Sequence, residues 1–212
     1  MIFAIDLEGV LAPEIWPALG DRFDLAELHL TTRDVADFEA LMSRRVAAVG
    51  NAGLTLRDLQ AVAHAIEPFL GAREFLARLR GMGQVIVISD TFHEFADPLM
   101  TRLGGHNLFA NRFAVDAEGR LAGFKLRIRG QKERIVSGFH AAGFKVAAVG
   151  DSLNDLSILK ACDFPVLYRP VPALHAEFPD AAVAQHLDEA LAALEQAWRR
   201  IENETDPNGS SR

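Results

Sequence analysis

The stretch Met1-Ile-Phe-Ala-Ile-Asp-Leu-Glu-Gly9 opens the chain with an apolar run that stops at an acidic residue. Three more short apolar runs follow, and each is typical of a strand that is buried on both faces of a parallel sheet. Amphipathic segments separate the runs, which indicates helices that cover the sheet. The expected strands are residues 2–6, 85–89, 146–150 and 164–167, and the expected helices around them are residues 72–80, 93–103, 131–142, 153–161 and 187–201. The sequence therefore predicts an α/β fold.

Residues 11–68 interrupt this alternation, because they contain no convincing strand. Their periodic segments, residues 33–49 and 55–66, have the spacing of helices, and Thr55 and Asp58 are placed as in a capping box. We therefore expect a Rossmann-like parallel sheet with helices on both faces, and a small all-helical cap inserted after the first strand.

Two further stretches differ from the rest of the chain. Residues 112–129 alternate in character on either side of Asp116-Ala-Glu-Gly119, which predicts a hairpin with a glycine turn. Residues 203–212 are polar and rich in Asn, Gly and Ser, which indicates a disordered tail. The predicted division is a core domain of residues 1–12 and 69–202, a cap of residues 13–68, and the tail.

The 212 residues carry 22 basic and 29 acidic side chains, a formal net charge of −7. Basic residues gather only in short stretches, at Arg44-Arg45 and between Lys125 and Arg134, so we expect no binding to nucleic acid. No segment has the pattern of a signal peptide or the length of a membrane span, so we expect no membrane association. The single cysteine, Cys162, excludes an internal disulfide and fits a reducing compartment, and a cytoplasmic location is expected.

Reactive polar residues follow three of the four expected strands. The first strand ends in Asp6-Leu-Glu-Gly9, the second in Ser89-Asp-Thr91, and the third in Gly150-Asp-Ser-Leu-Asn-Asp155. In an open α/β sheet, ligands bind outside the carboxyl ends of the strands, so these groups are expected to converge. Lys132, at the start of the helix before the third of these strands, can reach the same place. The sequence thus predicts one site built from four segments.

These residue types suit a phosphate ester bound beside Mg²⁺. Asp6 and Asp151 supply hard carboxylate oxygens, the ligands that Mg²⁺ prefers. Ser89 offers a hydroxyl and backbone amides at a helix start, and Lys132 neutralises charge on the transferring group. The expected cofactor is therefore Mg²⁺, and the expected reaction is phosphoryl transfer.

Asp6 also has the chemistry of a nucleophile, since a carboxylate can attack phosphorus and form an aspartyl phosphate. Glu8 lies two residues further on, so its side chain leans to the same side as that of Asp6. Its carboxyl group can protonate the leaving alkoxide and then deprotonate the incoming acceptor. Each such residue alone has an ordinary explanation as a turn residue, a helix cap or a surface charge. Their joint occurrence at these strand ends favours catalysis.

The same four segments resemble the four motifs of the haloacid-dehalogenase-like phosphatases. The resemblance covers nearly the whole chain, and the expected helical insertion lies where that family places its smaller cap. It implies that Asp6 is the nucleophile and Glu8 the acid/base, and that Ser89 and Lys132 hold the phosphate.

The resemblance also implies a metal site and further contacts to the substrate. Asp151 would bind Mg²⁺ together with Asp6 and the backbone carbonyl of Glu8, and Asp155 would support both the metal site and Lys132. The remaining polar residues of the matching motifs are expected to bind the substrate: Asp90, Thr91 and Asn154.

Four residues of the expected cap resemble the substrate-recognition residues of phosphoserine phosphatases: Glu14, Phe38, Met42 and Arg45. Arg45 can hold the carboxylate of phosphoserine through two parallel hydrogen bonds, and Glu14 can pair with its ammonium group. Phe38 and Met42 share one face of the expected helix with Arg45 and can close over the ligand. The substrate implied is therefore phosphoserine.

A narrower likeness concerns the run from Leu7 to Trp16. This run is similar to that of bacterial phosphoserine phosphatases that also transfer the phosphoryl group to homoserine. The same likeness is seen in the runs Thr31-Thr-Arg-Asp34 and Ser89-Asp-Thr-Phe92. It also includes Glu8, at a position where most phosphatases of the wider superfamily have Asp. Homoserine is thus implied as a second partner, and the oligomeric state is left open, with a homodimer as one alternative.

Three other interpretations predict different behaviour. A phosphatase of the same fold could act on another small phosphate ester, such as a sugar phosphate. A phosphoacceptor signalling domain also places acidic residues, Ser/Thr and Lys around Mg²⁺, but it retains its phosphate and has no place for the helical insertion. A non-catalytic relative that only binds ligand would have lost a motif position, and none is lost here.

Overall fold

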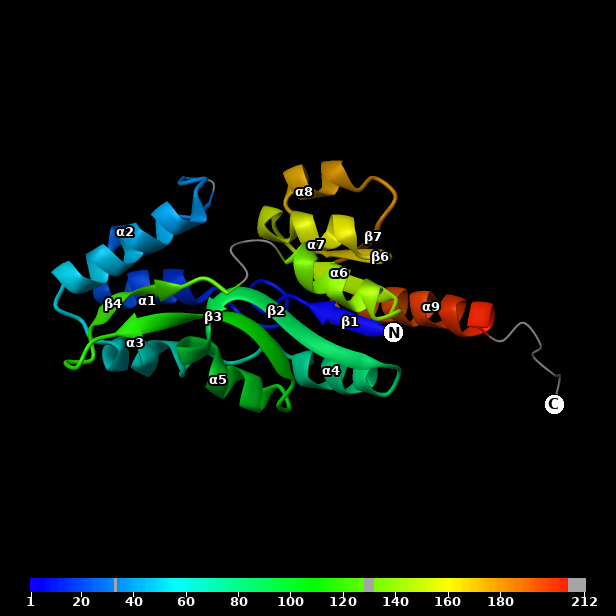
Figure 1. Ribbon diagram of the computed structural model, residues 1–212, viewed down its shortest axis with the longest axis horizontal. Helices are drawn as coiled ribbons and strands as arrows, with labels where there is room; N and C mark the ends of the chain where they lie inside the picture. Colours follow the sequence, from blue (N-terminus) through cyan, green and yellow to red (C-terminus); the bar gives the residue numbers. More distant parts are fainter. Residues whose placement is uncertain (33, 128–131, 206–212) are drawn as a thin grey trace.

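The computed structural model describes residues 1–32, 34–127 and 132–205, which form an α/β fold around a seven-stranded sheet (Figure 1). The strands lie in the order β4-β3-β2-β1-β5-β6-β7, and every neighbouring pair is parallel except β3 and β4. Their bounds are β1 (Ile2–Ile5), β2 (Gln84–Phe92), β3 (Asn107–Val115), β4 (Leu121–Lys125), β5 (Val146–Gly150), β6 (Phe164–Tyr168) and β7 (Ala182–Ala184). The predicted parallel sheet is confirmed, with the first strand at its centre.

Burial on both faces of the sheet explains why the central strands are continuous apolar runs. In β1, Phe3 and Ile5 belong to one hydrophobic cluster, and Ile2 and Ala4 belong to another. Complete burial of a large side chain of this kind is worth about 1.5–3 kcal/mol. On one face of the sheet, the first cluster is completed by α4 (Ala72–Arg80), α5 (His93–Arg102) and α9 (Leu187–Thr205). On the other face, the second cluster is completed by α6 (Glu133–Ala141), α7 (Leu156–Ala161) and α8 (Pro172–Glu177). Helices on both faces are thereby confirmed.

The segment between β1 and α4 is helical, as predicted. It contains α1 (Ile15–Phe23), the 3₁₀ turn η1 (Ala26–Leu28), α2 (Phe38–Asn51) and α3 (Leu56–Ala63), and no strand occurs in residues 13–32 or 34–68. The capping box of Thr55 and Asp58 begins α3, because each residue's side chain accepts a backbone amide of the other.

An aromatic cluster joins these inserted helices to the sheet. Trp16 on α1 makes edge-to-face contacts with Phe92, Phe95 and Phe113, at ring-centroid distances of 6.4, 5.5 and 6.2 Å. Phe92 ends β2 and stacks on Phe113 of β3 at 3.8 Å, and Phe95 lies on α5. Figure 1 shows α1, α2 and α3 grouped with β4 and α5, at the end of the molecule away from α9. The inserted helices are therefore packed on the end of β2, where part of the predicted site lies.

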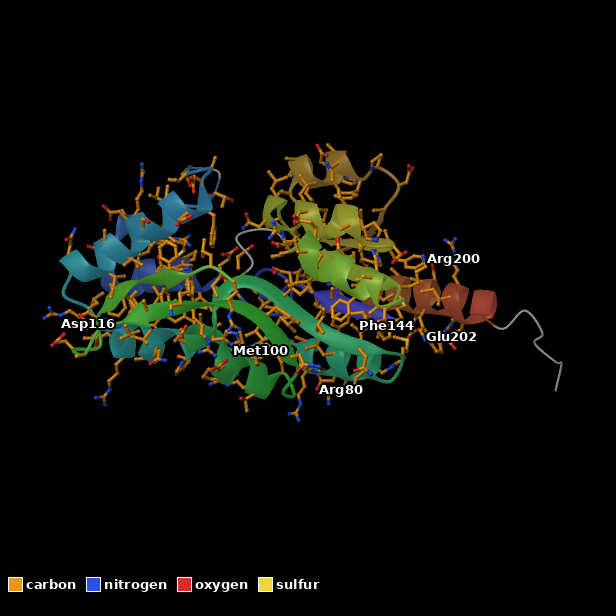
Figure 2. The ribbon with its side chains drawn as sticks, in the orientation of Figure 1. Arg80, Met100, Asp116, Phe144, Arg200 and Glu202 are labelled. Atoms are coloured by element: carbon orange, nitrogen blue, oxygen red, sulfur yellow. The ribbon has the colours of Figure 1, made fainter. Side chains whose placement is uncertain are left out.

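The predicted hairpin is formed by β3 and β4. In its turn, the Asp116 carboxylate accepts the amides of Glu118 and Arg120, and Gly119 has a φ of 80°. Figure 2 shows Asp116 at the tip of this hairpin, at the opposite end of the molecule from Arg200 and Glu202 on α9. Residues 128 and 129 of the predicted stretch lie outside the described residues.

Several boundaries differ from the sequence prediction. Helix α2 begins at Phe38 and not at residue 33, because the Asp37 carboxylate caps it by accepting the amides of Glu39 and Ala40. Residues 153–155 form a 3₁₀ turn before α7. Helix α9 continues to Thr205, so the predicted tail is wrong for residues 203–205. The rest of the predicted tail, residues 206–212, lies outside the described residues. The same is true of Arg33 and Gln131, which belong to two of the predicted helices.

Helices α1 and α8 and strand β7 have no counterpart in the sequence prediction. Helix α1 contains Pro17 and Gly20, residues that weaken a helical pattern, and β7 has only 3 residues. No helix in the described ranges combines the length and the apolar character that a membrane span requires.

Candidate active site

The carboxyl ends of three neighbouring strands bring the predicted residues together. β1 pairs with β2 on one side and with β5 on the other. Asp6 follows β1, Ser89 and Thr91 lie near the end of β2, and Asp151 follows β5. Because adjacent strands are about 4.8 Å apart, side chains at these three ends can reach one small ligand.

Lys132 is the cation at the centre of this arrangement. It is the N-cap of α6 and only 1% exposed, and its Nζ lies 2.8 Å from Asp6 Oδ1 and 2.7 Å from Asp155 Oδ1. A third carboxylate oxygen, Asp90 Oδ2, is 3.5 Å away. Burial alone would lower the pKa of Lys132, but the charges of Asp155, Asp6 and Asp90 raise it well above its usual value. Lys132 is therefore a permanent cation in the site.

Three carboxyl groups form a cluster that can hold a metal ion. Oxygen atoms of Asp6, Asp151 and Asp155 all lie within 4.8 Å of one another. Burial, and then the charge of Asp155, raise the pKa of Asp6 well above its usual value, against the effect of Lys132. The same two causes raise the pKa of Asp151 to about 7. Lys132 thus does not neutralise the whole cluster, and a hard divalent cation would offset the remaining charge.

Two glycines leave room for these carboxyl groups. A Cβ atom on Gly9, which has a φ of 85°, would lie 2.3 Å from Asp151 Oδ2. A Cβ atom on Gly150 would lie 2.4 Å from Asp155 Cβ. The Asp155 carboxylate in turn accepts the backbone amide of Asp151 at 3.1 Å, which orients the loop after β5. The residues present therefore fit a magnesium site.

Glu8 lies beside the cluster with the properties of a proton carrier. Its Oε1 is buried, and neither this atom nor the hydroxyl of Thr91 has a hydrogen-bond partner among the described residues. Burial, and then the charge of Glu14, raise the pKa of Glu8 to about 7, although Thr91, the Ile15 amide and Arg45 act in the opposite direction. A carboxyl group with this pKa can give or accept a proton near neutral pH.

A cavity of about 90 Å³ connects the strand ends to the inserted helices. Of the predicted residues, those that line it are Asp6, Glu8, Glu14, Phe38, Arg45, Ser89, Asp90, Thr91, Lys132 and Asn154. Asp151 and Asp155 do not line it and belong to the acidic cluster beside Asp6. Met42 does not line the cavity either, because it is fully buried in the hydrophobic cluster of the cap.

Arg45 is held firmly in the wall of the cavity. Its Nη2 donates to the Leu30 carbonyl at 2.6 Å, and its guanidinium lies 4.8 Å from the centre of the Trp16 ring. It is 7% exposed, and in the part of the chain that the structure describes its Nε has no hydrogen-bond partner. Burial lowers the pKa of Arg45 to about 10, so it remains charged at neutral pH. A buried cation with a free donor can bind an anionic group of a ligand.

The sequence prediction did not include several residues that line the cavity: Trp16, Thr31, Thr32, Leu41 and Ser152. The Thr32 hydroxyl donates to Asn154 Oδ1 at 3.1 Å and so connects the cap to the loop after β5. Trp16 and Thr31-Thr32 do occur in the runs that resemble the homoserine-transferring enzymes, which was a usable signal. Leu41 has no signal in the sequence beyond its position on the same helix as Phe38.

Known proteins resemble this chain over most of its length. A model of the haloacid dehalogenase-like hydrolases matches residues 1–163. A phosphoserine phosphatase of Pseudomonas syringae pv. tomato is 38% identical over 199 residues, which cover 94% of this chain and 84% of the relative. Phosphoserine phosphatase ThrH of Pseudomonas aeruginosa is 38% identical over 178 residues, which cover 84% of this chain and 87% of the relative.

Solved structures show the same fold. A phosphoserine phosphatase in apo form has a TM-score of 0.73 at 22% identity, covering 86% of this chain and 92% of that one. A substrate-bound phosphoserine phosphatase complex also has a TM-score of 0.73, at 19% identity, covering 94% of this chain and 97% of that one. The family match spans most of the chain, including every strand of the site. This protein belongs to the haloacid dehalogenase-like hydrolases.

Proposed function

We propose that this hydrolase is a Mg²⁺-dependent phosphoserine phosphatase that works through an aspartyl phosphate on Asp6. The observation that carries the proposal is the contact of Lys132 with Asp6 and Asp155 beside a cavity that Arg45 and Glu14 also line. Among these residues, Lys132 suits a phosphate group, and Arg45 and Glu14 suit an amino acid. The names of the two Pseudomonas relatives support the substrate.

In the first half of the proposed reaction, a carboxylate oxygen of Asp6 forms a bond to phosphorus as the bond from phosphorus to the serine oxygen breaks. Lys132, with the hydroxyl and amide donors of Ser89 and Thr91, stabilises the charge on the phosphoryl oxygens. Glu8 enters this step protonated and gives its proton to the departing serine oxygen. Mg²⁺, held by Asp6, Asp151 and the Glu8 carbonyl with support from Asp155, would neutralise negative charge on the phosphoryl group.

In the second half, Glu8 takes a proton from the incoming acceptor. The acceptor oxygen forms a bond to phosphorus, and the bond between phosphorus and Asp6 breaks, which restores the carboxylate. A pKa of about 7 suits both roles of Glu8, because neither protonation state is strongly favoured near neutral pH.

The proposed contacts to the amino-acid part of the substrate come from the cap. Arg45 would bind the carboxylate of phosphoserine, since no described residue accepts a hydrogen bond from its Nε and its guanidinium is buried against Trp16. Glu14 would pair with the ammonium group. Phe38 lines the cavity and would cover the ligand, whereas Met42 supports Arg45 from the cap interior, with its sulfur 3.8 Å from Nη1.

The proposal is tested with a panel of phosphate esters, measuring released phosphate with wild-type protein and Asp6→Asn. Phosphoserine should be turned over repeatedly and preferred to sugar phosphates and aryl phosphates, and Asp6→Asn should be inactive. Asp21→Asn, at an exposed site on α1, is the matched control and should remain active. A single phosphorylation without turnover would identify a signalling domain, and a preference for another ester would refute phosphoserine as the substrate.

Transfer to homoserine is a second proposed activity of the same site. It is favoured by Glu8 within the run Leu7 to Trp16, and by recognition groups, Arg45 and Glu14, that suit any α-amino acid. Homoserine is one methylene longer than serine, a difference usually worth only about 1–3 kcal/mol in binding. Phosphoserine and homoserine supplied together should yield phosphohomoserine, detected by phosphorus resonance. Serine and free phosphate alone, even at high homoserine, would refute the transfer.

A further inference from the structure

Strand β2 leaves its regular pairing where it carries Ser89, Asp90 and Thr91. Ile88 lies opposite Phe109 of β3, whereas Phe92 lies opposite Asn111, so these three residues of β2 face a single residue of β3. A bulge of this kind re-aims side chains and removes backbone groups from the ladder. All three bulged residues line the cavity. The bulge therefore gives this part of the site its shape.

Asn111 provides the hydrogen bonds that hold the bulge. Its Nδ2 donates to the Asp90 carbonyl oxygen at 2.8 Å, and its Oδ1 accepts the backbone amide of Arg127 at 3.0 Å. The side chain is 1% exposed, so water cannot readily replace either bond. A carbonyl needs a donor and an amide needs an acceptor, and a carboxamide supplies both from one end of a short side chain.

One of the two backbone segments that Asn111 joins carries groups of the site. Asp90 lies between Ser89 and Thr91, and its carboxylate is 3.5 Å from Lys132 Nζ. The other segment, at Arg127, lies just after β4. Asn111 itself does not line the cavity, so it acts on the site only through these neighbours.

We propose that Asn111 is a positioning residue for phosphoryl transfer, which fixes the β2 bulge against Arg127 at the end of the β3–β4 hairpin. The inference rests on the proposed function, because that function assigns Ser89, Thr91 and Lys132 to the phosphoryl group. Displacing such groups by about 1 Å can lower a rate by about 100-fold. Loss of the carboxamide therefore affects the chemical step more than recognition of the amino acid.

Two variants and one control test the proposal. Asn111→Asp keeps the shape and the acceptor for Arg127 but loses the donor to Asp90, and Asn111→Leu loses both hydrogen bonds. The control is Leu194→Ala, a change on α9 within the first hydrophobic cluster, which should lower the Tm without altering the site. Each protein is assayed well below its Tm with phosphoserine and with p-nitrophenyl phosphate, and its affinity for orthophosphate in the presence of Mg²⁺ is measured by calorimetry.

Both Asn111 variants should lower kcat by about 10- to 100-fold on both esters and weaken orthophosphate binding about tenfold, while the ratio of the two KM values stays near that of the wild type. The Leu194→Ala control should keep its kcat despite a lower Tm. If Asn111→Leu fails to fold, Asn111→Asp decides the question.

The outcomes separate this inference from the proposed function. Wild-type kcat and orthophosphate affinity in folded Asn111→Asp would overturn the role of Asn111 alone, as would losses that only match those of the control. If the wild-type protein turns over the aryl ester but not phosphoserine, phosphoserine is refuted as the substrate. The effect of the Asn111 variants can then still be measured with the aryl ester. Wild-type protein that binds no orthophosphate would overturn both.

Discussion

Lys132 Nζ lies 2.8 Å from Asp6 Oδ1, although the two residues are 126 positions apart in the sequence. Both are more than nine-tenths buried, and Asp155 contacts the same ammonium group at 2.7 Å. Removing one partner of a buried ion pair leaves the other charge uncompensated, which costs far more than losing a surface pair. We therefore expect this contact to affect stability, pH dependence and catalysis together.

Replacing Lys132 by Met should destabilise the protein by about 3–5 kcal/mol at pH 8, because Asp6, Asp90 and Asp155 lose their shared cation. Burial raises the pKa values of Asp6 and Asp90 in the folded state, and without the cation they lie even further above those in the unfolded chain. The folded state then retains protons that the unfolded state loses. The loss of stability of Lys132→Met relative to wild type should therefore shrink as the pH is lowered from 8 to 5.

Urea unfolding of Lys132→Met and wild type at both pH values measures this effect. Lys160→Met removes a half-exposed lysine paired with Glu177 and should change stability little at either pH. A deficit for Lys132→Met that stays constant between pH 5 and pH 8 would show that the carboxyl groups are not its cause.

Metal binding should depend on pH near neutrality. Burial and the charge of Asp155 raise the pKa of Asp151 to about 7, and Mg²⁺ binds only the ionised carboxylate. The apparent Kd for Mg²⁺ should therefore rise by about tenfold per pH unit below pH 7 and level off above it. Calorimetric titration between pH 6 and pH 8.5 checks this, and an affinity that does not change over this range would contradict the assignment of Asp151.

The metal-free protein should lose stability as the pH rises through the same region. The pKa values of Glu8 and Asp151, each about 7 in the folded state, lie above their values of 4.5 and 3.8 in the unfolded chain. The folded state thus binds more protons than the unfolded state between about pH 4 and pH 7, and the free energy of unfolding falls across this window. Saturating Mg²⁺ at pH 8 should raise the Tm, whereas Asp151→Asn should reduce that rise.

Arg45→Met should raise the KM for phosphoserine at least tenfold and change that for p-nitrophenyl phosphate much less. A charged hydrogen bond is worth about 1.5–3 kcal/mol, and only phosphoserine carries the carboxylate that Arg45 would bind. Glu14→Gln should show the same selectivity through the ammonium group. Arg44→Met, at the exposed neighbouring position, is the control and should resemble wild type. Equal losses on the two esters would assign Arg45 to packing on Trp16 and not to recognition.

Gly150→Ala should destabilise the protein by about 1–3 kcal/mol and lower its activity, because the added Cβ would meet Asp155 Cβ at 2.4 Å. Asp155 cannot move without disturbing Lys132 and the amide of Asp151. Gly138→Ala is the matched control: it lies inside α6 with open space around the added atom, and it should stabilise the helix by about 0.5–1 kcal/mol. Thermal unfolding and turnover of the two variants side by side test the difference, and a Gly150→Ala protein as stable and active as wild type would refute it.

The sequence by itself determined the sheet and the position of the site. Burial of a strand on both faces leaves a local signature, a short apolar run, and the polar residues directly after Ile5, Ile88 and Gly150 mark where those runs end. Parallel strands place their carboxyl ends at one edge, so Asp6, Ser89 and Asp151 could be grouped before any contact was known. The capping box of α3 was equally readable, because both of its partners lie within one helical turn.

Only the tertiary structure decided how each side chain is used. Phe38 and Met42 are both apolar and lie on one helix, yet Phe38 lines the cavity and Met42 is buried in the cap. Their spacing in the sequence does not reveal this difference, because it depends on how the helix packs against Trp16 and its neighbours. The same holds for Asn111, an unremarked polar residue in the chain until the bulge in β2 exposes a carbonyl that needs its donor. Contacts of this kind join segments far apart in sequence, and their geometry is set by the whole packed core and not by local pattern.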